Sequence, residues 1–410
     1  MKKKEINYES ISWPIFRGDT ALSGTTQDEP PEKPVLLWNF KTGSEIISSP
    51  VIGFGLVFTG STDGKVYALD LKTGAKTWEF DAGDDIEASP LLADEFLYIG
   101  SLSGDFFALH ARSGEVSWKA ETEGPIYGSA NWVKKPGSPE KLIFVGSHDN
   151  KMYCFSDNQK FFGVPRRGEP MRSFLNKSFV QTFSKVWPPA GPPEAKRVGA
   201  PHPRRQNFLI KWTHETDHFI NGAPATDGEI IIFGGCDEKL RILSVLDGRK
   251  KGEVPVGSYI PGSAALVGNR AYLGHYGNKL ACIDIENKKI LWEYGDKRKG
   301  EAFFSSPAVG REHVVIGSRD GCVHCVDRRT GRKVWVFRTR DDVDSSPVIA
   351  GNKVVAASTD GRLYMIDLRT GKEIWSYEIG AAIIGCPAVA GGLIVTGAAD
   401  GRIYVFGEDS

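Results

Sequence analysis

The sequence predicts an all-β protein, an eight-bladed β-propeller built from four-stranded antiparallel blades. Two observations lead to this fold class. A unit of about 40 residues recurs along most of the 410-residue chain, and each unit holds short alternating apolar and polar runs between glycine turns. Four-stranded units of this length are typical of propeller blades, which bury a shared core only when they stack around a ring.

The first complete unit contains the four expected strands, at residues 50–53, 56–61, 65–70 and 76–80. Alternation in the third run is the pattern of a half-buried strand. An Asp-Gly pair precedes this run and a Thr-Gly pair follows it. Both pairs predict tight turns, because Gly tolerates the positive φ that such turns require.

Two small residues align the units. One stands before the first strand, followed by Pro or Ala, at Ser49, Ser89, Ser129, Ala223, Ser263, Ser306, Ser346 and Cys386. The other ends the second strand, at Gly60, Gly100, Gly146, Gly235, Gly274, Gly317, Ala357 and Gly397. Eight copies of each position predict eight blades.

A tryptophan lies in the fourth strand of most units, at Trp38, Trp78, Trp118, Trp212, Trp292, Trp335 and Trp375. A single ligand does not need seven equivalent contacts, so we expect these indoles to be structural. Each should be wedged between blades, with its N–H bonded to the backbone. One gap of 80 residues spans two units, and the missing tryptophan would lie near Gly252.

The ends of the chain are out of phase with the repeat. The last unit stops at Phe406 without a tryptophan strand, whereas residues 36–41 form such a strand before the first unit. We therefore expect residues 36–41 to complete the last blade, which removes open sheet edges. The predicted organisation is an N-terminal segment 1–35, a propeller domain 36–406 interrupted by an insertion at 157–210, and a tail 407–410.

The insertion differs in composition from the rest of the chain. It holds ten basic residues, three acidic residues and eight prolines, and because the whole chain has no net charge, the remainder carries seven excess negative charges. Apolar residues of 171–187 fall within about half of a helical wheel, as in a short basic amphipathic helix. Its candidate binding residues are Arg166, Arg167, Arg172, Phe179, Phe183 and Trp187.

Three interpretations of the insertion remain open. Its prolines disfavour regular structure and favour a loop with no specific role. Its basic excess favours an arm that binds a partner protein, an anionic surface or a nucleic acid. Its lack of repeat character favours a segment foreign to the ancestral gene. The charge balance of the whole chain argues against a protein whose entire surface binds nucleic acid.

Targeting features and cysteines narrow the class further. The basic start is followed by no apolar signal region and no lipidated cysteine, and no stretch approaches the roughly 20 apolar residues of a membrane span. We expect a cytoplasmic monomer, or a periplasmic one if a signal has been removed. Six scattered cysteines form no disulfide framework. Cys322 and Cys325 have C-x-x-C spacing, but an offset of three places them on opposite faces of a strand, which disfavours a metal or redox site.

Units of the form GS-x-DG-K/R-x-Y-x-x-D-x-x-TG-x-x-x-W, followed by SSP, resemble the PQQ-type (quinoprotein-like) eight-bladed propeller family. Residues 13–18, WPIFRG, are similar to the W-P-x-F-R-G segment of many members. The resemblance covers about 36–156 and 208–406, plus that segment. Its non-enzymatic branch includes the B-type lipoprotein of the outer-membrane β-barrel assembly machinery, so the resemblance implies a protein-binding scaffold, although this chain has no lipobox. Fold alone does not specify function.

The same family includes quinone-dependent dehydrogenases, which the resemblance makes the alternative function, with PQQ and Ca²⁺ held in the axial funnel. Alcohol-oxidising members resemble one another in a vicinal cysteine pair, a calcium site and a catalytic Asp. This sequence has no adjacent cysteines, no C-x-x-C-H haem segment and no phosphate-binding glycine loop. We therefore expect no cofactor and no enzymatic activity.

Propellers bind at their axial faces, where loops converge around the channel. The residues that lead into the first strands differ from blade to blade: Ile47, Glu87, Tyr127, Asn221, Pro261, Phe304, Asp344 and Ile384. Such variation fits a binding surface for a partner protein, and it fits ordinary loop variation equally well.

Overall fold

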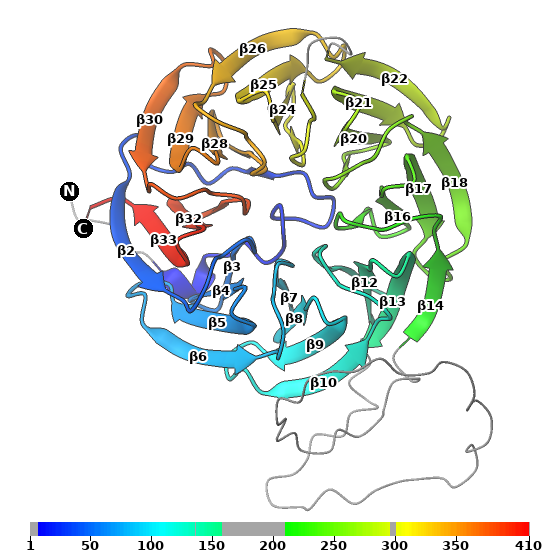
Figure 1. The fold of residues 1–410 in the computed structure, drawn as a ribbon, viewed down its shortest axis with the longest axis horizontal. Helices are drawn as coiled ribbons and strands as arrows, with labels where there is room; N and C mark the ends of the chain where they lie inside the picture. The colour runs from blue at the N-terminus through cyan, green and yellow to red at the C-terminus, as the bar shows by residue number, and fades with distance from the viewer. Residues whose placement is uncertain (1–6, 136, 158–209, 296–300, 410) are drawn as a thin grey trace, which may run out of the picture.

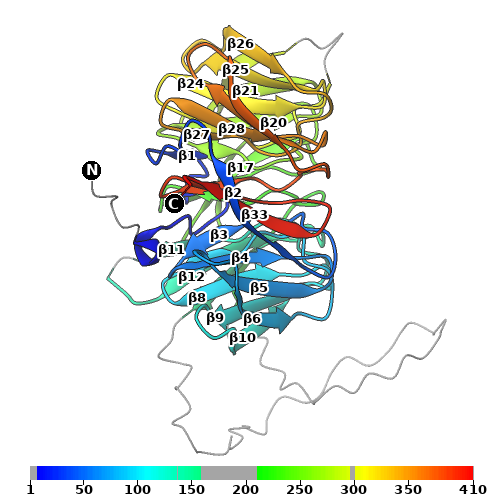
Figure 2. The same ribbon diagram turned by 90° about the vertical axis from the view of Figure 1, so that its left-hand side faces the viewer.

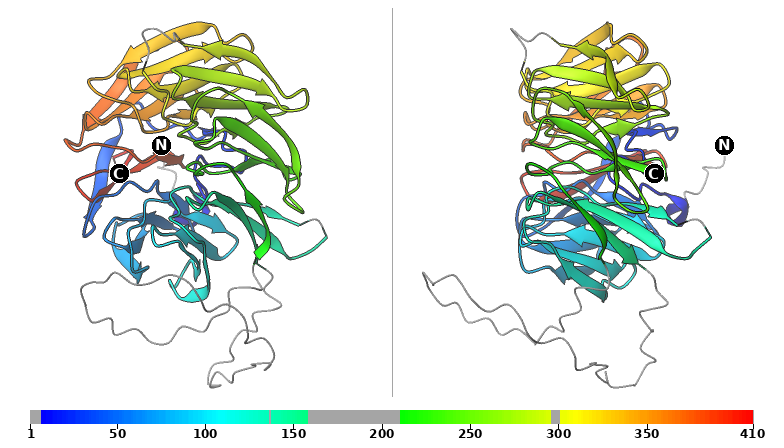
Figure 3. Two further views of the ribbon diagram at one scale, coloured as in Figure 1. Left: turned by 45° about the vertical axis from the view of Figure 1, so that its right-hand side comes forward. Right: turned by 90° about the vertical axis from the view of Figure 1, so that its right-hand side faces the viewer.

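Short strands joined by glycine turns fold into a ring of eight antiparallel sheets, which confirms the predicted fold class (Figure 1). The computed structural model describes residues 7–135, 137–157, 210–295 and 301–409. Within each blade the first strand lies at the central channel and the fourth at the outer edge. Seen edge-on, the eight blades form a single layer (Figures 2 and 3). No helix among the described residues is long and apolar enough to span a bilayer.

The first four blades follow the chain in order. Blade 1 contains β3 (Val51–Gly53), β4 (Leu56–Gly60), β5 (Lys65–Asp70) and β6 (Lys76–Asp81). Blade 2 contains β7 (Leu91–Ala93), β8 (Phe96–Gly100), β9 (Asp105–His110) and β10 (Val116–Glu121). Blade 3 contains β11 (Asn131–Lys134), β12 (Lys141–Gly146), β13 (Lys151–Asp157) and β14 (Ile210–Glu215). Blade 4 contains β15 (Ala225–Thr226), β16 (Ile230–Phe233), β17 (Lys239–Ser244) and β18 (Lys250–Pro255).

The other four blades close the ring. Blade 5 contains β19 (Ala265–Leu266), β20 (Arg270–His275), β21 (Lys279–Asp284) and β22 (Lys289–Tyr294). Blade 6 contains β23 (Ala308–Val309), β24 (His313–Ser318), β25 (Cys322–Asp327) and β26 (Lys333–Arg338). Blade 7 contains β27 (Val348–Ala350), β28 (Lys353–Ala357), β29 (Arg362–Asp367) and β30 (Glu373–Glu378). Blade 8 contains β31 (Ala388–Ala390), β32 (Leu393–Gly397), β33 (Arg402–Gly407) and β2 (Val35–Lys41).

Blade 8 is built from both ends of the chain. Strand β2 pairs antiparallel with β33, from Val35 opposite Gly407 to Lys41 opposite Arg402. In Figure 1 the blue strand β2 lies along the red strand β33. The strand that precedes the first repeat therefore supplies the outer strand that the last repeat lacks.

Blade-to-blade packing explains the small residue at the end of the second strand. A Cβ at Gly60 or Gly397 would overlap the side chain of an isoleucine from the adjoining interblade loop, Ile86 and Ile46 respectively. Both isoleucines are fully buried. Close-packed interiors do not absorb such overlap, so these positions require glycine.

The N-terminal segment before β2 lies across the channel and bonds to all eight blades. It contains one 3-10 turn, η1 (Tyr8–Ser10), and the short strand β1 (Thr25–Thr26), which adds parallel to β27. Its hydrogen bonds reach the blades in chain order, through these groups: Trp13 to Ile52, Pro14 O to Leu92, Thr20 O to the Asn131 side-chain amide and to Thr226 N, Ala21 O to Leu266, Ser23 O to Val309, Gly24 O to Ile349, and the Asp28 carboxylate to the Gly391 N–H.

The WPIFRG residues anchor this segment. Trp13 packs over Gly18, whose φ of +88° and contact with the indole exclude a side chain. Arg17 is fully buried and donates to the Pro347 carbonyl at 2.6 Å and to the Cys386 thiol at 3.3 Å. The segment is thus part of the folded core and closes one end of the channel.

Candidate binding site at the axial mouth

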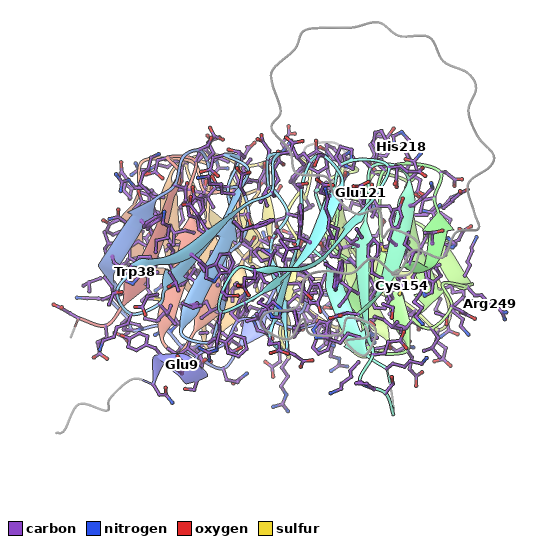
Figure 4. The ribbon with its side chains drawn as sticks, turned by 90° about the horizontal axis from the view of Figure 1, so that it is seen from below. Glu9, Trp38, Glu121, Cys154, His218 and Arg249 are labelled. Atoms are coloured by element: carbon purple, nitrogen blue, oxygen red, sulfur yellow. The ribbon has the colours of Figure 1, made fainter. Side chains whose placement is uncertain are left out.

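The eight lead-in residues named from the sequence come together at one end of the channel. All of them, from Ile47 to Ile384, line a single depression of about 190 Å³. Phe16 of the N-terminal segment also lines it. Figure 4 shows His218 on the mouth side and Glu9 on the opposite side, where the N-terminal segment begins. The mouth is therefore a depression open on one face, with the N-terminal segment across its base.

A ring of serine hydroxyls, interrupted where Ala223 and Cys386 replace serine, holds the wall of this depression. In the small-residue position before the first strand, each serine Oγ accepts the N–H of the equivalent residue in the preceding blade. The bonds run from Cys386 N to Ser49, Ser49 N to Ser89, Ser89 N to Ser129, Ala223 N to Ser263, Ser263 N to Ser306 and Ser306 N to Ser346. The repeat predicts a small residue at this position but not the bonds between its copies, for which the recurring serine before the first strand is the signal.

Aromatic side chains border the mouth over blades 3 to 6. In one group, the His148 ring lies 4.3 Å from Tyr127 and stacks on Phe219 at 4.7 Å, while its Nε2 lies 2.6 Å from the side-chain Oδ1 atom of Asn221. Burial lowers the pKa of His148, and the neighbouring His218 lowers it further. These aromatic groups could not be predicted from the repeat, because only Tyr127 and Phe304 among their members lie in lead-in positions.

A second aromatic group continues along the same border. Tyr276 contacts Tyr259 at 6.4 Å and Phe304 at 6.0 Å. Tyr259, Tyr276 and Phe219 each leave more than a third of their surface exposed, at 48%, 44% and 39%. We call these residues, with Tyr127, His148 and Phe304, the aromatic border.

The charged residues of the mouth differ in whether they have a partner of opposite charge. Arg319 binds Asp344 through two bonds of 2.9 Å and covers the Phe304 ring at 4.0 Å. Glu87 has no hydrogen-bond or ion-pair partner among the described residues, and burial, followed by the charge of Asp85, raises the pKa of its carboxyl. The depression itself is lined by these two carboxylates and by no Lys or Arg. It therefore presents unpaired negative charge beside apolar surface.

The repeated tryptophans lie away from the mouth, between blades. Trp38, Trp78, Trp212 and Trp335 donate their indole N–H to a carbonyl of the next blade, at 3.0, 2.9, 3.0 and 2.7 Å. Trp118 and Trp292 have a buried N–H without a described partner, which differs from the expectation, and Trp375 is half-buried beside Tyr377 and Phe406. The candidates of the insertion, Arg166 to Trp187, lie outside the described residues.

Comparison with known proteins agrees with the architecture. The family described as outer membrane protein assembly factor BamB matches residues 32–160, 209–337 and 253–407. BamB from Moraxella catarrhalis superimposes with a TM-score of 0.66 at 17% identity, covering 92% of this chain and all of that one. No curated protein matches in sequence.

Enzymes share the same fold. A europium-containing methanol dehydrogenase gives a TM-score of 0.70 at 12% identity, covering 97% of this chain and 98% of that one. Quinohemoprotein alcohol dehydrogenase from Comamonas testosteroni gives 0.69 at 13%, covering 98% and 82%. At these identities the structural likeness establishes the fold alone. The sequence match covers most of the propeller, and on that ground the chain belongs to the BamB-type PQQ-repeat family.

Proposed function

We propose that this chain is a non-catalytic scaffold that binds a protein segment at its axial mouth. The observation that carries the proposal is the convergence of eight non-repeated residues on one depression, next to exposed aromatic rings. Aromatic residues are enriched at the centres of protein interfaces, and contiguous exposed apolar surface marks interaction sites. The family description, an outer membrane assembly factor, supports a role in binding other proteins.

The chemistry of the mouth indicates what the segment carries. Apolar or aromatic side chains would pack on the aromatic border. A Lys or Arg of the partner would neutralise Glu87, which lacks a cation of its own. Such a pair would fix the register of the bound segment more than it would add affinity.

The alternative, a PQQ-dependent dehydrogenase, fits the lining poorly. PQQ is a tricarboxylic quinone, whereas the depression offers two carboxylates and no basic side chain. Arg319, which covers the Phe304 ring, is already bound to Asp344. An anion there would meet uncompensated negative charge, so we derive no cofactor chemistry for this site.

Affinity purification from the native host with matched variants tests the proposal. Phe219→Ser and Tyr276→Ser alter the aromatic border, whereas Val116→Ser and Leu246→Ser remove exposed apolar residues elsewhere, on β10 and in the turn before β18. We expect the mouth variants to reduce recovery of a specific partner at least tenfold and the control variants to retain it. Equal recovery with all four variants would overturn the proposal.

Two further arms separate the alternatives. A chain lacking residues 160–208 should still recover the partner if the mouth binds it, whereas loss of the partner would assign binding to the insertion. Adding PQQ with Ca²⁺ should change neither the melting temperature nor dye reduction by an alcohol. A thermal shift together with dye reduction would show that the chain is a dehydrogenase and would overturn the proposal of a non-catalytic scaffold.

A further inference from the structure

Three metal-ligating side chains meet in blade 6, outside the mouth depression. Asp320 lies in the turn before β25, and Cys322 and His324 follow on that strand, two residues apart and therefore on one face. One donor atom from each residue lies within 4.8 Å of the other two, and no other such trio occurs in the described part of the chain. Cys325, the other cysteine of the C-x-x-C spacing, takes no part in this cluster, because it is fully buried in an apolar core on the opposite face.

We propose that Asp320, Cys322 and His324 bind a thiophilic divalent cation, for which Zn²⁺ is the best match. A thiolate, an imidazole and a carboxylate are the donor set that zinc accepts in tetrahedral sites. The His324 Nε2 atom lies 3.1 Å from the Asp320 Oδ2 atom. Two ligand atoms around a tetrahedral ion with bonds of about 2.0 Å are separated by roughly 3.3 Å. Nitrogen and oxygen are therefore already spaced for a shared ion.

The histidine is held in the orientation that a ligand requires. The Tyr294 hydroxyl lies 3.0 Å from His324 Nδ1, which leaves Nε2 directed at Asp320. Metal-binding histidines ordinarily have their second ring nitrogen bonded in this way, which fixes the tautomer. The Phe303 ring packs edge-on against the imidazole at 5.1 Å.

The exposure of the three side chains matches a site with one open position. Cys322 and His324 are 4% and 7% exposed, whereas the Asp320 side chain is 31% exposed. An ion would thus rest on a buried thiol and imidazole and face solvent past the carboxylate. Water or a partner's side chain would complete the tetrahedron.

Comparison between blades separates this cluster from ordinary framework. In blades 1, 3, 7 and 8 a tyrosine stands at the place of His324 and bonds the turn aspartate, so a contact with that aspartate alone is structural. The place of Cys322 is taken in those blades by Lys65, Lys151, Arg362 and Arg402. Blade 6 therefore has a thiol where those blades have a cationic side chain, and an imidazole where they have a phenol. The two changes together convert a structural contact into a donor set.

The site is independent of the proposed partner segment, although the two are adjacent. Arg319, next to Asp320 in the chain, bonds Asp344 of the mouth. A bound ion would lie on the same face as the depression.

Cobalt is the probe for the experiment, because Co²⁺ replaces Zn²⁺ in such sites and absorbs visibly. Titrating Co²⁺ into the full reduced chain should produce tetrahedral d–d absorption and a thiolate-to-cobalt charge-transfer band. Both signals should saturate at one equivalent of Co²⁺. Zn²⁺ should abolish both signals. Absence of the charge-transfer band would overturn the proposal, even if cobalt binds elsewhere.

Matched variants keep the test independent of folding. His324→Tyr restores the residue of four other blades, so it should fold with an unchanged melt and weaken cobalt binding at least a hundredfold. Cys322→Ser should remove the charge-transfer band, whereas Cys325→Ser should leave it intact. Tyr294→Phe should weaken binding about tenfold, as loss of an orienting contact does. A band that persists in Cys322→Ser, or disappears in Cys325→Ser, would exclude this site.

Discussion

At the scale of single residues, the Thr-Gly turns and the tryptophans form pairs across blades. The glycine of each such turn lies under the indole of the preceding blade: a Cβ at Gly371 would sit 2.6 Å from the Trp335 Cγ atom. Where the tryptophan is missing, at Gly252, the next blade has Lys288 in place of the glycine, at a φ of 53°. A Cβ at Gly252 would meet the Lys288 side chain at 2.6 Å. The large and small partners have exchanged places.

Gly371→Ala should destabilise the protein by about 2 kcal/mol or more, because the new methyl group meets the indole and the backbone has a φ of +70°. Lys288→Ala is the matched control, since it has positive φ and no indole above it. We expect the control to change stability by less than about 1 kcal/mol. Urea denaturation measures both, and equal losses would show that packing against Trp335 is unimportant.

Glu87→Gln should stabilise the folded protein at pH 7, by up to about 1 kcal/mol after screening by solvent. Burial raises the pKa of this carboxyl above its unfolded value. Protonation of Glu87 therefore favours the folded state. This contribution to stability is fully present below the unfolded pKa, and it is lost as pH rises through the folded pKa. The advantage of the variant should shrink between pH 7 and pH 4 in thermal melts. A less stable variant at pH 7 would reveal a favourable partner for Glu87.

At the scale of elements, each blade is completed by its neighbours. The inner edge is joined by the serine ring and the outer edge by the indoles. The second strands are almost entirely buried, as β4 and β8 are, whereas the fourth strands are largely exposed or half-buried, as β6 and β22 are. No blade buries its faces alone, which is the general condition of repeat architectures.

Trp335→Ala tests this dependence between blades. The indole is 8% exposed, packs against Gly371 and donates to the Leu368 carbonyl at 2.7 Å. Its removal should cost about 3–5 kcal/mol, through lost burial and the cavity left behind. Val334→Ala, on the same strand but 41% exposed, should be nearly neutral. Chemical denaturation compares them, and a negligible loss for Trp335→Ala would mean that blades 6 and 7 do not depend on this contact.

At the scale of the whole molecule, the ring depends on residues that precede the first repeat. Strand β2 completes blade 8, and the segment from Trp13 to Asp28 bonds to every blade. Strand β2 closes the sheet edge of blade 8, and the segment links blades that do not touch one another.

Two deletions separate these contributions. Removing residues 1–42 takes away both β2 and the segment, and it should abolish a cooperative thermal transition because blade 8 is left open. Removing residues 1–32 retains β2, so one transition should survive at a markedly lower temperature. Calorimetry distinguishes these outcomes. An unchanged melt after removal of 1–42 would show that the ring does not need this closure.

The repeats themselves determined most of the fold. Blade number, the strand positions of the first blade within one residue and the interblade place of the tryptophans follow from period, alternation and turn glycines, which act locally. The lead-in residues of the mouth followed from the same phase. The insertion shows the limit of this reasoning, because it has no repeat with which to be aligned.

Tertiary structure alone decided what joins the repeats. The path of the N-terminal segment through the channel, the serine ring, the aromatic border and the Asp320–Cys322–His324 cluster all depend on contacts between residues distant in the chain or on different faces of a strand. Sequence period specifies which way a side chain points within its blade. It does not specify what that side chain meets, because the neighbour comes from another blade or from the segment that crosses the ring.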